Sequence, residues 1–356
     1  MSPSKNGGSD RNGKVMIEVD HLSRYYGPVP AINNVSFRAE KGEILGFLGP
    51  NGAGKTTTMR MLTGYLPPTS GRALIAGHDV VEESLAARSE IGYLPENTPL
   101  YPEMTISGYL NFMARLRGVE NRNEAVERVM ERVSIDHRAD DLIGHLSKGF
   151  RQRVGIAQAL VHDPSVMILD EPTIGLDPKQ IREVRSLIHE LGGEHTVLIS
   201  THILSEAQQI CDRVLIIKRG QIVAEDTPAQ LTARLSGGER IRVVTNRAAE
   251  VAAVRKTLGK AGGVTSVEHE GAGAYLVTAD AGTDPRDELA RGIIGGGWPL
   301  LELVPTKMSL EDVFLELIGA DDGESIQIDD PANPDGADSG SNEELEETND
   351  AEADDA

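Results

Sequence analysis

The segment Gly49–Thr56 reads Gly-Pro-Asn-Gly-Ala-Gly-Lys-Thr and fits the phosphate-loop pattern G-x-x-x-x-G-K-[ST]. It follows the apolar run Ile44–Leu48, which predicts a buried strand, and leads into a helical pattern that begins at Thr57. Glycines here let backbone N–H groups turn inward around phosphate oxygens, while Lys55 can reach the β and γ oxygens and Thr56 can offer a hydroxyl to Mg²⁺. The pattern predicts a strand–loop–helix unit that binds a nucleoside triphosphate.

Charge is concentrated at the carboxyl end of the chain. Fifteen acids and no Lys or Arg lie in 321–356, and without these acids the formal net charge of −21 becomes −6. The remaining chain is only mildly acidic, which gives no support to nucleic-acid binding. We expect 321–356 to be a disordered, solubilising tail and not a docking segment, because it lacks aromatics and has few apolar residues. Residues 1–14 are also polar and predict a second, short tail without a signal peptide.

Two absences in the sequence bear on location. No run of 18 or more apolar residues occurs, so the chain is not expected to span a bilayer, and any membrane role needs a partner. Cys211 is the single cysteine, which excludes an intramolecular disulfide and fits a reducing compartment.

At 356 residues the chain is long enough for two domains. The pattern of the first domain, 15–235, predicts α/β structure with strands near 15–19, 35–39, 73–76 and 91–94. A helical insertion is predicted to follow over about 102–160, with helices at 106–117 and 123–133. Continuous apolar runs at 166–169 and 196–199 predict parallel strands covered on both faces, and the helix predicted over 178–191 joins them. Runs at 214–217 and 221–223 predict a closing hairpin.

The second domain, 236–320, shows a different pattern. Alternating runs near 240–245, 264–270, 274–279 and 300–304 are separated by helical patterns at 248–261 and 284–294. This β-α-β-β-α-β order predicts a small ferredoxin-like α+β domain. A last helix is predicted over 310–318, and no cluster of His, Cys or paired carboxylates here indicates chemistry.

Three residues follow buried strands and are candidates for chemistry. Asp170 and Glu171 come after the run 166–169, at the carboxyl edge of a parallel sheet, where ligands bind in such folds. Asp170 is placed to hold Mg²⁺, and Glu171 can orient and polarise the water that attacks a γ-phosphate. His202 follows another buried strand and could reach the γ-phosphate, although a lone histidine at a strand end is more often structural.

The segment Leu146–Arg153 precedes a helical run, and Ser147 is a good N-cap. A capped helix start with a glycine, Gly149, makes an electropositive and open anion site. An ordinary capped basic helix explains the same residues equally well from physics alone.

Taken together, these motifs resemble an ATP-binding-cassette ATPase, the nucleotide-binding subunit of an ABC transporter. The resemblance covers roughly 15–229, with the motifs in family order: the phosphate loop at 49–57, the Q-loop at 91–96, the signature at 146–150, Walker B at 167–171, the D-loop at 175–177 and the switch histidine His202. The implied fold is a P-loop NTPase core with an antiparallel β subdomain and a helical insertion. The residues that the resemblance assigns to ATP are Tyr26, Gly49, Pro50, Asn51, Gly52, Ala53, Gly54, Lys55, Thr56, Thr57, Glu96, Ser147, Lys148, Gly149 and Asp177.

The resemblance also implies roles and partners. Glu171 and His202 are the expected catalytic residues, Thr56, Glu96 and Asp170 the expected Mg²⁺ ligands, and Tyr26 the ring on which adenine stacks. Two cassettes would close head to tail around ATP, so a second ATP-binding subunit, as a homodimer or with a sister subunit, and a separate transmembrane permease are implied. The chain would then sit peripherally at the cytoplasmic face of the cell membrane.

Two positions depart from the commonest family pattern. The Q-loop has Glu96 where Gln is usual, and the signature reads LSKGF where LSGGQ is usual. Glu96 keeps an oxygen ligand but adds negative charge beside the phosphates, and Phe150 cannot make the polar contact of a glutamine. Together with the small second domain, these departures resemble the subgroup paired with ABC-2-type permeases, including gliding-motility exporters.

Two other functions fit the sequence less well. A soluble ABC ATPase acting on ribosomes or nucleic acid would normally have two cassettes in one chain or a long coiled-coil insertion, and this sequence shows neither. A P-loop kinase or GTPase is disfavoured because the signature is present and a guanine-specific Asn-Lys-x-Asp is absent.

Overall fold

An antiparallel sheet is built from the first strands of the chain. The computed structural model describes residues 13–235, 238–246, 250–280, 282–306 and 314. Strands β1 (Val15–Tyr26), β2 (Val29–Glu40), β4 (Ser70–Ile75) and β5 (His78–Asp79) pair in the order β2-β1-β4-β5. β1 and β2 are longer than predicted, because they close through a tight turn in which Gly27 takes a φ of +59°. Tyr26, predicted beside a turn, is the last residue of β1.

The second sheet contains the predicted parallel strands. Its strands are β3 (Ile44–Leu48), β6 (Ile91–Leu94), β7 (Val166–Asp170), β8 (Thr196–Thr201), β9 (Arg213–Lys218) and β10 (Gln221–Asp226), in the order β10-β9-β3-β8-β7-β6. Neighbouring strands from β9 to β6 run parallel, and β10 returns antiparallel to β9 as the predicted hairpin. All residues of β3, β7 and β8 are buried, as expected for strands covered on both faces.

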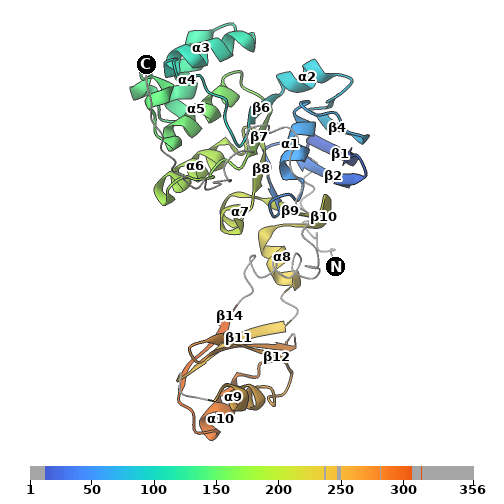
Figure 1. The fold of residues 1–356 in the computed structure, drawn as a ribbon, viewed down its shortest axis with the longest axis vertical. Coiled ribbons are helices and arrows are strands. Elements are labelled where there is room, and N and C mark those ends of the chain that lie inside the picture. Colours follow the sequence, from blue (N-terminus) through green and yellow to red (C-terminus); the bar gives the residue numbers. More distant parts are fainter. Residues whose placement is uncertain (1–12, 236–237, 247–249, 281, 307–313, 315–356) are drawn as a thin grey trace, which may run out of the picture. The chain divides into compact units, whose positions relative to one another are not determined.

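The two faces of this sheet belong to different cores, because successive side chains of a strand point to opposite sides. Leu45 and Phe47 of β3 join the core that contains α1 (Lys55–Leu62) and the antiparallel sheet. Ile44 and Leu48 join the core formed with the helices of the opposite face. Figure 1 shows α1 between the two sheets.

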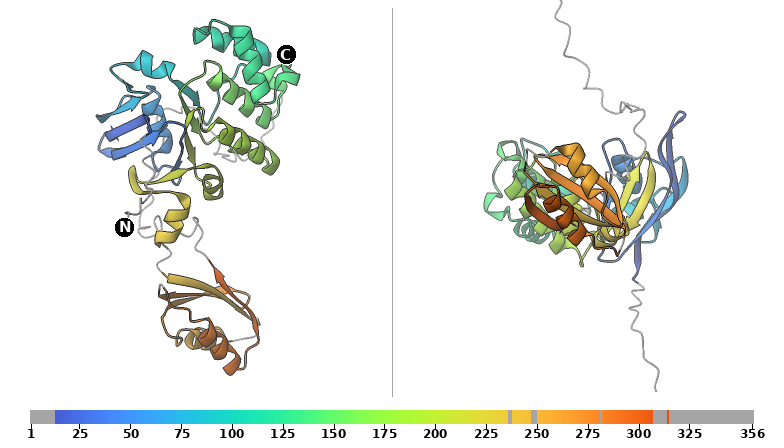
Figure 2. Two further views of the ribbon diagram at one scale, coloured as in Figure 1. Left: turned by 180° about the vertical axis from the view of Figure 1, so that it is seen from behind. Right: turned by 90° about the horizontal axis from the view of Figure 1, so that it is seen from below.

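Helices cover the face of this parallel sheet that lies opposite α1. The predicted insertion forms α3 (Ile106–Leu116), α4 (Arg122–Arg132) and α5 (Lys148–Leu160), which group together in Figures 1 and 2, and α6 (Pro178–Leu191) and α7 (Leu204–Ile210) follow. The short helices α2 (Ser84–Ser89), α7 and α8 (Pro228–Leu235) were not predicted. In the described part of the chain, no helix is long and apolar enough to cross a membrane.

The later elements form a third sheet with its own core. β11 (Gly238–Thr245), β12 (Val264–Gly271), β13 (Ala274–Asp280) and β14 (Leu300–Thr306) are antiparallel in the order β12-β13-β11-β14. Helices α9 (Val251–Leu258) and α10 (Arg286–Gly295) pack on one face through side chains such as Val254 and Ile293. The helix predicted over 310–318 lies outside the described residues apart from position 314, as do both tails apart from 13–14.

Candidate functional site

The predicted site residues follow four neighbouring parallel strands. The phosphate loop follows β3, His202 follows β8, Asp170 and Glu171 end or follow β7, and Glu96 lies shortly after β6. Because β3, β8, β7 and β6 are parallel neighbours in this order, their carboxyl ends share one edge of the sheet. The fold therefore lines up residues that are far apart in the sequence.

The phosphate loop is held by close backbone packing. A Cβ at Gly49 would lie 2.6 Å from the Ile217 carbonyl oxygen, and Gly54 has a φ of +107°. Lys55, the first residue of α1, is 6% exposed, and its Nζ donates to the carbonyl oxygens of Gly49 at 2.8 Å and Pro50 at 3.3 Å. The lysine therefore curls over its own loop, where a phosphate would lie.

Asp170 is a fully buried carboxylate at the end of β7. Its Oδ1 accepts a hydrogen bond from the Ser200 hydroxyl, while Oδ2 is buried without a hydrogen-bond partner among the described residues. Burial raises the pKa of Asp170, and the Ser200 and Thr56 hydroxyls partly oppose that rise. A buried carboxylate oxygen that accepts nothing, with the Thr56 hydroxyl close by, fits a divalent cation such as Mg²⁺.

Glu171 links the phosphate loop to the switch histidine. Its Oε1 lies 3.3 Å from Lys55 Nζ, and its Oε2 accepts from Nδ1 of His202 at 2.8 Å. The backbone is unusual, since φ is +46°, and the N–H of Glu171 donates to Ser200 Oγ at 3.0 Å. Lys55, Glu171 and His202 therefore form one connected network, and the histidine, whose side chain is 40% exposed, is its outer member.

Two other predicted contacts to the nucleotide lie apart from this network. Glu96 is exposed beyond β6, and no hydrogen bond or ion pair of it to a described residue is found. The Tyr26 ring is 37% exposed, with the Arg24 guanidinium 5.1 Å from its centroid, so one face is already covered by a cation.

The signature residue Ser147 and the D-loop residue Asp177 each cap a helix. Ser147 caps α5 by accepting from the Phe150 N–H at 3.4 Å, as predicted. Asp177 caps α6 in a capping box with Gln180. Within the described residues, no hydrogen bond or ion pair connects Ser147, Lys148, Gly149 or Asp177 to the phosphate loop. Thus the single chain holds two separate groups of predicted site residues.

Phe150 has a structural role at the place where a glutamine is usual. Its ring lies 4.7 Å from the Arg138 guanidinium and 6.1 Å from the His137 ring. The side chain thus packs within the helical insertion, which agrees with its inability to make a polar contact with ATP.

Ser200 was not singled out from the sequence, yet it supports both carboxylates. Its hydroxyl donates to Asp170, its Oγ accepts from the Glu171 N–H, and its carbonyl oxygen lies 3.2 Å from the same nitrogen. The signal was a small polar residue directly after the apolar run Val197–Ile199, two positions before His202. A second missed contact is Thr173 Oγ1, which donates to buried Glu206 at 2.6 Å.

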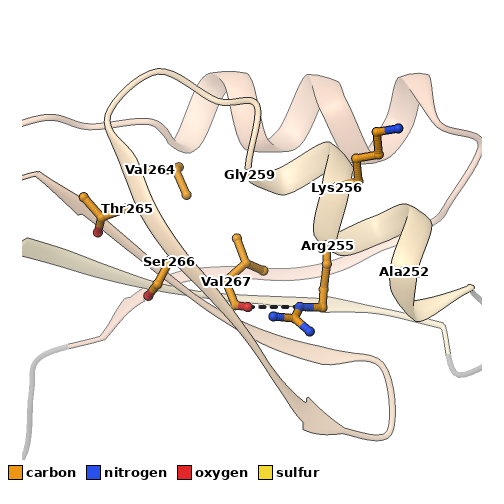
Figure 3. A pocket seen from close by; sticks show the side chains of 8 residues that line it. All are labelled: Ala252, Arg255, Lys256, Gly259, Val264, Thr265, Ser266 and Val267. Atoms are coloured by element: carbon orange, nitrogen blue, oxygen red, sulfur yellow. Dashed lines mark hydrogen bonds between the residues drawn. The ribbon is translucent and has the colours of Figure 1, made fainter.

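A separate hollow of about 460 Å³ lies beside α9 and β12. Figure 3 shows Arg255 on α9 donating from Nε to the Val267 carbonyl oxygen at 3.1 Å, with Thr265 and Ser266 along the same strand. The residues that line it include two cations but no carboxylate. No cluster of metal-ligating groups occurs in any part of the chain that the structure describes.

A glycine-rich loop between buried strand β3 and helix α1, with its lysine paired to a carboxylate that follows β7, the next strand but one in the sheet, defines a P-loop nucleoside triphosphatase. Comparison with known proteins gives the family. The family model described as "ABC transporter" matches residues 32–174.

Two curated relatives match almost over their full lengths. The bacitracin transport ATP-binding protein BcrA of Bacillus licheniformis is 35% identical over 306 residues, covering 85% of this chain and 97% of its own. The Nod factor export ATP-binding protein I of Burkholderia orbicola is 34% identical, and the match covers 85% of this chain and 97% of that protein. Other curated relatives are longer, and the matched region spans only 40% of their length.

A solved structure agrees with these matches. The dimeric bacterial ABC transporter cassette MJ0796 superposes with a TM-score of 0.55 at 26% identity, covering 60% of this chain and 98% of that one. The chain belongs to the ABC transporter family, as an ATP-binding subunit.

Proposed function

We propose that this chain binds and hydrolyses ATP together with a second copy of itself, and that closure of the two cassettes drives a separate transmembrane permease. The observation that carries the proposal is the network of Lys55, Glu171 and His202 at the end of the phosphate loop. The network supports the proposal because γ-phosphate transfer to water requires a cation, a carboxylate and a hydrogen-bond donor near the phosphate.

The proposed roles follow from this geometry. Glu171 orients and polarises the attacking water, His202 donates to the transferring phosphate, and Lys55 together with the loop N–H groups of residues 49–57 binds the β and γ oxygens. Tyr26 stacks on adenine through the ring face that Arg24 leaves open.

Mg²⁺ fits the donor set, with Thr56 and Asp170 as proposed ligands and Glu96 as a third. The support is Asp170 Oδ2, which is buried and has no hydrogen-bond partner among the residues that the structure describes. Bound Mg²⁺ would neutralise charge on the β- and γ-phosphates. Glu96 is exposed, so its contribution requires movement of the Q-loop toward Asp170.

The second half of the ATP site comes from another cassette. We assign Ser147, Lys148 and Gly149 at the start of α5, and Asp177 of the D-loop, to the ATP held by the partner. Their separation from the phosphate loop within one chain supports this assignment, because a single chain then carries two complementary half-sites. The dimeric arrangement of the similar cassette MJ0796 supports a homodimer.

The proposed permease-docking face lies near the carboxyl ends of α1 and α3, beside α2. A hollow of about 320 Å³ is lined there by residues such as Tyr65, Arg88 and Arg117. Tyr65 is 78% exposed and Leu85 of α2 is 79% exposed, so large apolar side chains are available for a partner. This docking places the chain peripherally, at the cytoplasmic face of the membrane.

The transport direction that we propose is export through an ABC-2-type permease. The names of full-length relatives, one of which is a Nod factor export protein, support it, as do the Glu96 and LSKGF departures.

We also propose the domain organisation of the sequence analysis, with the ATP-binding domain at 15–235, its helical subdomain at about 102–160, a ferredoxin-like domain at 236–320, and tails at 1–14 and 321–356. The β-α-β-β-α-β order and the sheet order β12-β13-β11-β14 support the ferredoxin-like assignment.

The test uses Glu171→Gln, which keeps the shape of the side chain and removes the carboxylate. We expect ATP binding to persist, turnover to fall by about 100-fold or more, and an ATP-dependent dimer to accumulate. Turnover near that of the unchanged chain would exclude Glu171 from its role.

The same variant identifies the partner. Affinity purification from detergent-solubilised native membranes with ATP, followed by mass spectrometry, should recover a stoichiometric multi-span protein without its own ATPase. Recovery only with ribosomes, DNA or soluble proteins would refute the transporter proposal.

A further inference from the structure

Lys148, the first residue of α5, lies across the D-loop. A Cβ atom added at Gly175 would overlap with Lys148 Nζ and would lie 3.3 Å from Lys148 Cε. At the next position, a Cβ at Gly149 would lie 2.5 Å from Cδ of Gln180, which belongs to the capping box of α6. The start of α5 therefore contacts the D-loop and the start of α6 at two successive residues.

The ammonium of Lys148 is poorly placed in electrostatic terms. It sits at the amino end of a thirteen-residue helix, where the helix dipole is positive, and the first turn of α5 contains no acid. Among the described residues, Lys148 has no ion pair or hydrogen bond. Lys148 rests instead on Gly175, whose φ of +66° and missing side chain make the space. A phosphate near Ser147 would relieve this charge.

The D-loop is coupled through short turns to Glu171. The Ile174 N–H donates to the Glu171 carbonyl oxygen at 3.1 Å, and the Leu176 N–H donates to the Thr173 carbonyl oxygen at 3.2 Å. These two overlapping turns leave little freedom between Gly175 and Glu171. The backbone of the D-loop is therefore linked directly to the backbone of Glu171.

We propose that Lys148 is a positioning residue that links the arrival of the partner's ATP to the placement of Glu171 in its own subunit. The inference rests on the proposed head-to-tail dimer. When the γ-phosphate held by the second copy reaches the start of α5, the ammonium turns to the phosphate and leaves Gly175. The D-loop can then shift, and Glu171 is set for hydrolysis only when both ATP sites are filled.

The test compares Lys148→Met, which keeps an unbranched apolar stem and removes the charge, with Lys148→Arg, which keeps the charge. Lys179→Met, on the exposed first turn of α6, is the matched control. All are made in the Glu171→Gln chain, so that ATP is bound without turnover. An added Ile174→Cys provides a reporter, because Cys211 is buried and burial raises its pKa to about 12, which suppresses its alkylation.

In the chain with Lys148, ATP should change the rate at which iodoacetamide alkylates the reporter cysteine. In Lys148→Met this ATP-dependent change should disappear, and the ATP concentration for half-maximal dimerisation should rise by about 10-fold or more. The affinity of the monomer for a fluorescent ATP analogue should stay unchanged, since the phosphate loop is intact. Arginine should restore both properties, and Lys179→Met should alter neither.

A Lys148→Met chain that dimerises normally and keeps the ATP-dependent change would overturn the inference and leave the proposed function intact. Absence of an ATP-driven dimer in the Glu171→Gln chain with Lys148 present would refute the proposed function itself. A loss of monomer affinity in Lys148→Met would also count against a positioning role.

Discussion

Lys55 and Glu171 are both almost fully buried, and each satisfies part of the other's charge across 3.3 Å. A buried ion pair of this kind contributes little net stability, because desolvation of both groups offsets their attraction. Its value is in placement. The pair holds the lysine and the carboxylate side by side at the phosphate loop, and His202 contacts the other oxygen of the same carboxylate.

At this scale, Lys55→Ala should reduce ATP affinity by about 100-fold or more, because charge-assisted hydrogen bonds to phosphate oxygens are lost. Equilibrium titration with a fluorescent ATP analogue measures the effect. Lys41→Ala, at an exposed turn lysine, should bind as the unchanged chain does. Normal affinity in Lys55→Ala would contradict the assignment of the loop.

A second residue-level prediction concerns His162, which follows α5. Its Nε2 lies 3.0 Å from the Ile91 carbonyl oxygen and must donate to it, while Nδ1 is buried without a partner among the described residues. Burial, and then the positive charge of Arg117, lower the pKa of His162 from 6.5 to about 4. At a pH between about 4 and 6.5, His162 is therefore protonated in the unfolded chain and neutral in the folded chain.

Stability contributed by the neutral ring is therefore complete above pH 6.5 and is lost as the pH falls toward 4. The loss should be about 1–3 kcal/mol. His162→Gln can still donate to Ile91 but does not titrate, so urea denaturation between pH 4 and 7 should show a flatter profile. His189→Gln, on the exposed side of α6, should leave the profile as it was. An unchanged slope in His162→Gln would exclude this histidine as the source.

At the scale of elements, the contact between α5 and β6 depends on a glycine. A Cβ at Gly92 in the middle of β6 would overlap with the Ala159 carbonyl oxygen of α5 and lie 2.9 Å from Cγ of Pro164. The strand that carries the Q-loop can therefore approach the signature helix closely. A side chain at this position would push the two elements apart.

Gly92→Ala should destabilise the cassette by about 1–3 kcal/mol, the usual cost of overpacking a core. Chemical denaturation measures the change in the free energy of unfolding. Gly295→Ala in α10 is the control, because nothing lies near its Cβ and alanine favours a helix. A neutral Gly92→Ala would show that β6 and α5 separate at little cost.

Elements with strong periodicity were predictable from the sequence, whereas the contacts that complete the site were not. β6 and α6 begin and end where the apolar patterns predicted, because buried strands and amphipathic helices leave a clear period. The short helices α2 and α7 have too few turns to show one. Ser200 is two positions from His202 in sequence, but its contact with Asp170 depends on the register in which β7 pairs with β8, and a single sequence does not reveal that register.

The site residues likewise divide into those that local sequence motifs predict and those that depend on tertiary packing. The phosphate loop, Asp170, Glu171 and His202 were predicted from local motifs, and the structure brings them to one sheet edge. The contact of Lys148 with Gly175 was not predicted, because it depends on how the start of α5 packs on the loop after β7.

For the whole molecule, the acidic segment 321–356 dominates the net charge without contributing a predicted site residue. Its deletion should change the formal charge from −21 to −6 and leave ATPase activity nearly intact, while solubility falls. Steady-state ATPase rates and sedimentation of the two chains test this. A large loss of activity would assign the segment a direct role in the catalytic cycle.

The position of β3 in its sheet also determines how long this strand stays unpaired while the chain is synthesised. Both neighbours of β3 arrive late: β8 pairs through Val197 and β9 through Arg213, about 150 residues after Ile44. At ribosomal rates of about 5–20 residues per second, this fully apolar strand waits roughly 8–30 s before a neighbour emerges. The nascent chain thus carries an unpaired apolar strand during this interval, and a chaperone that holds the first 200 or so residues would have its greatest effect on yield then.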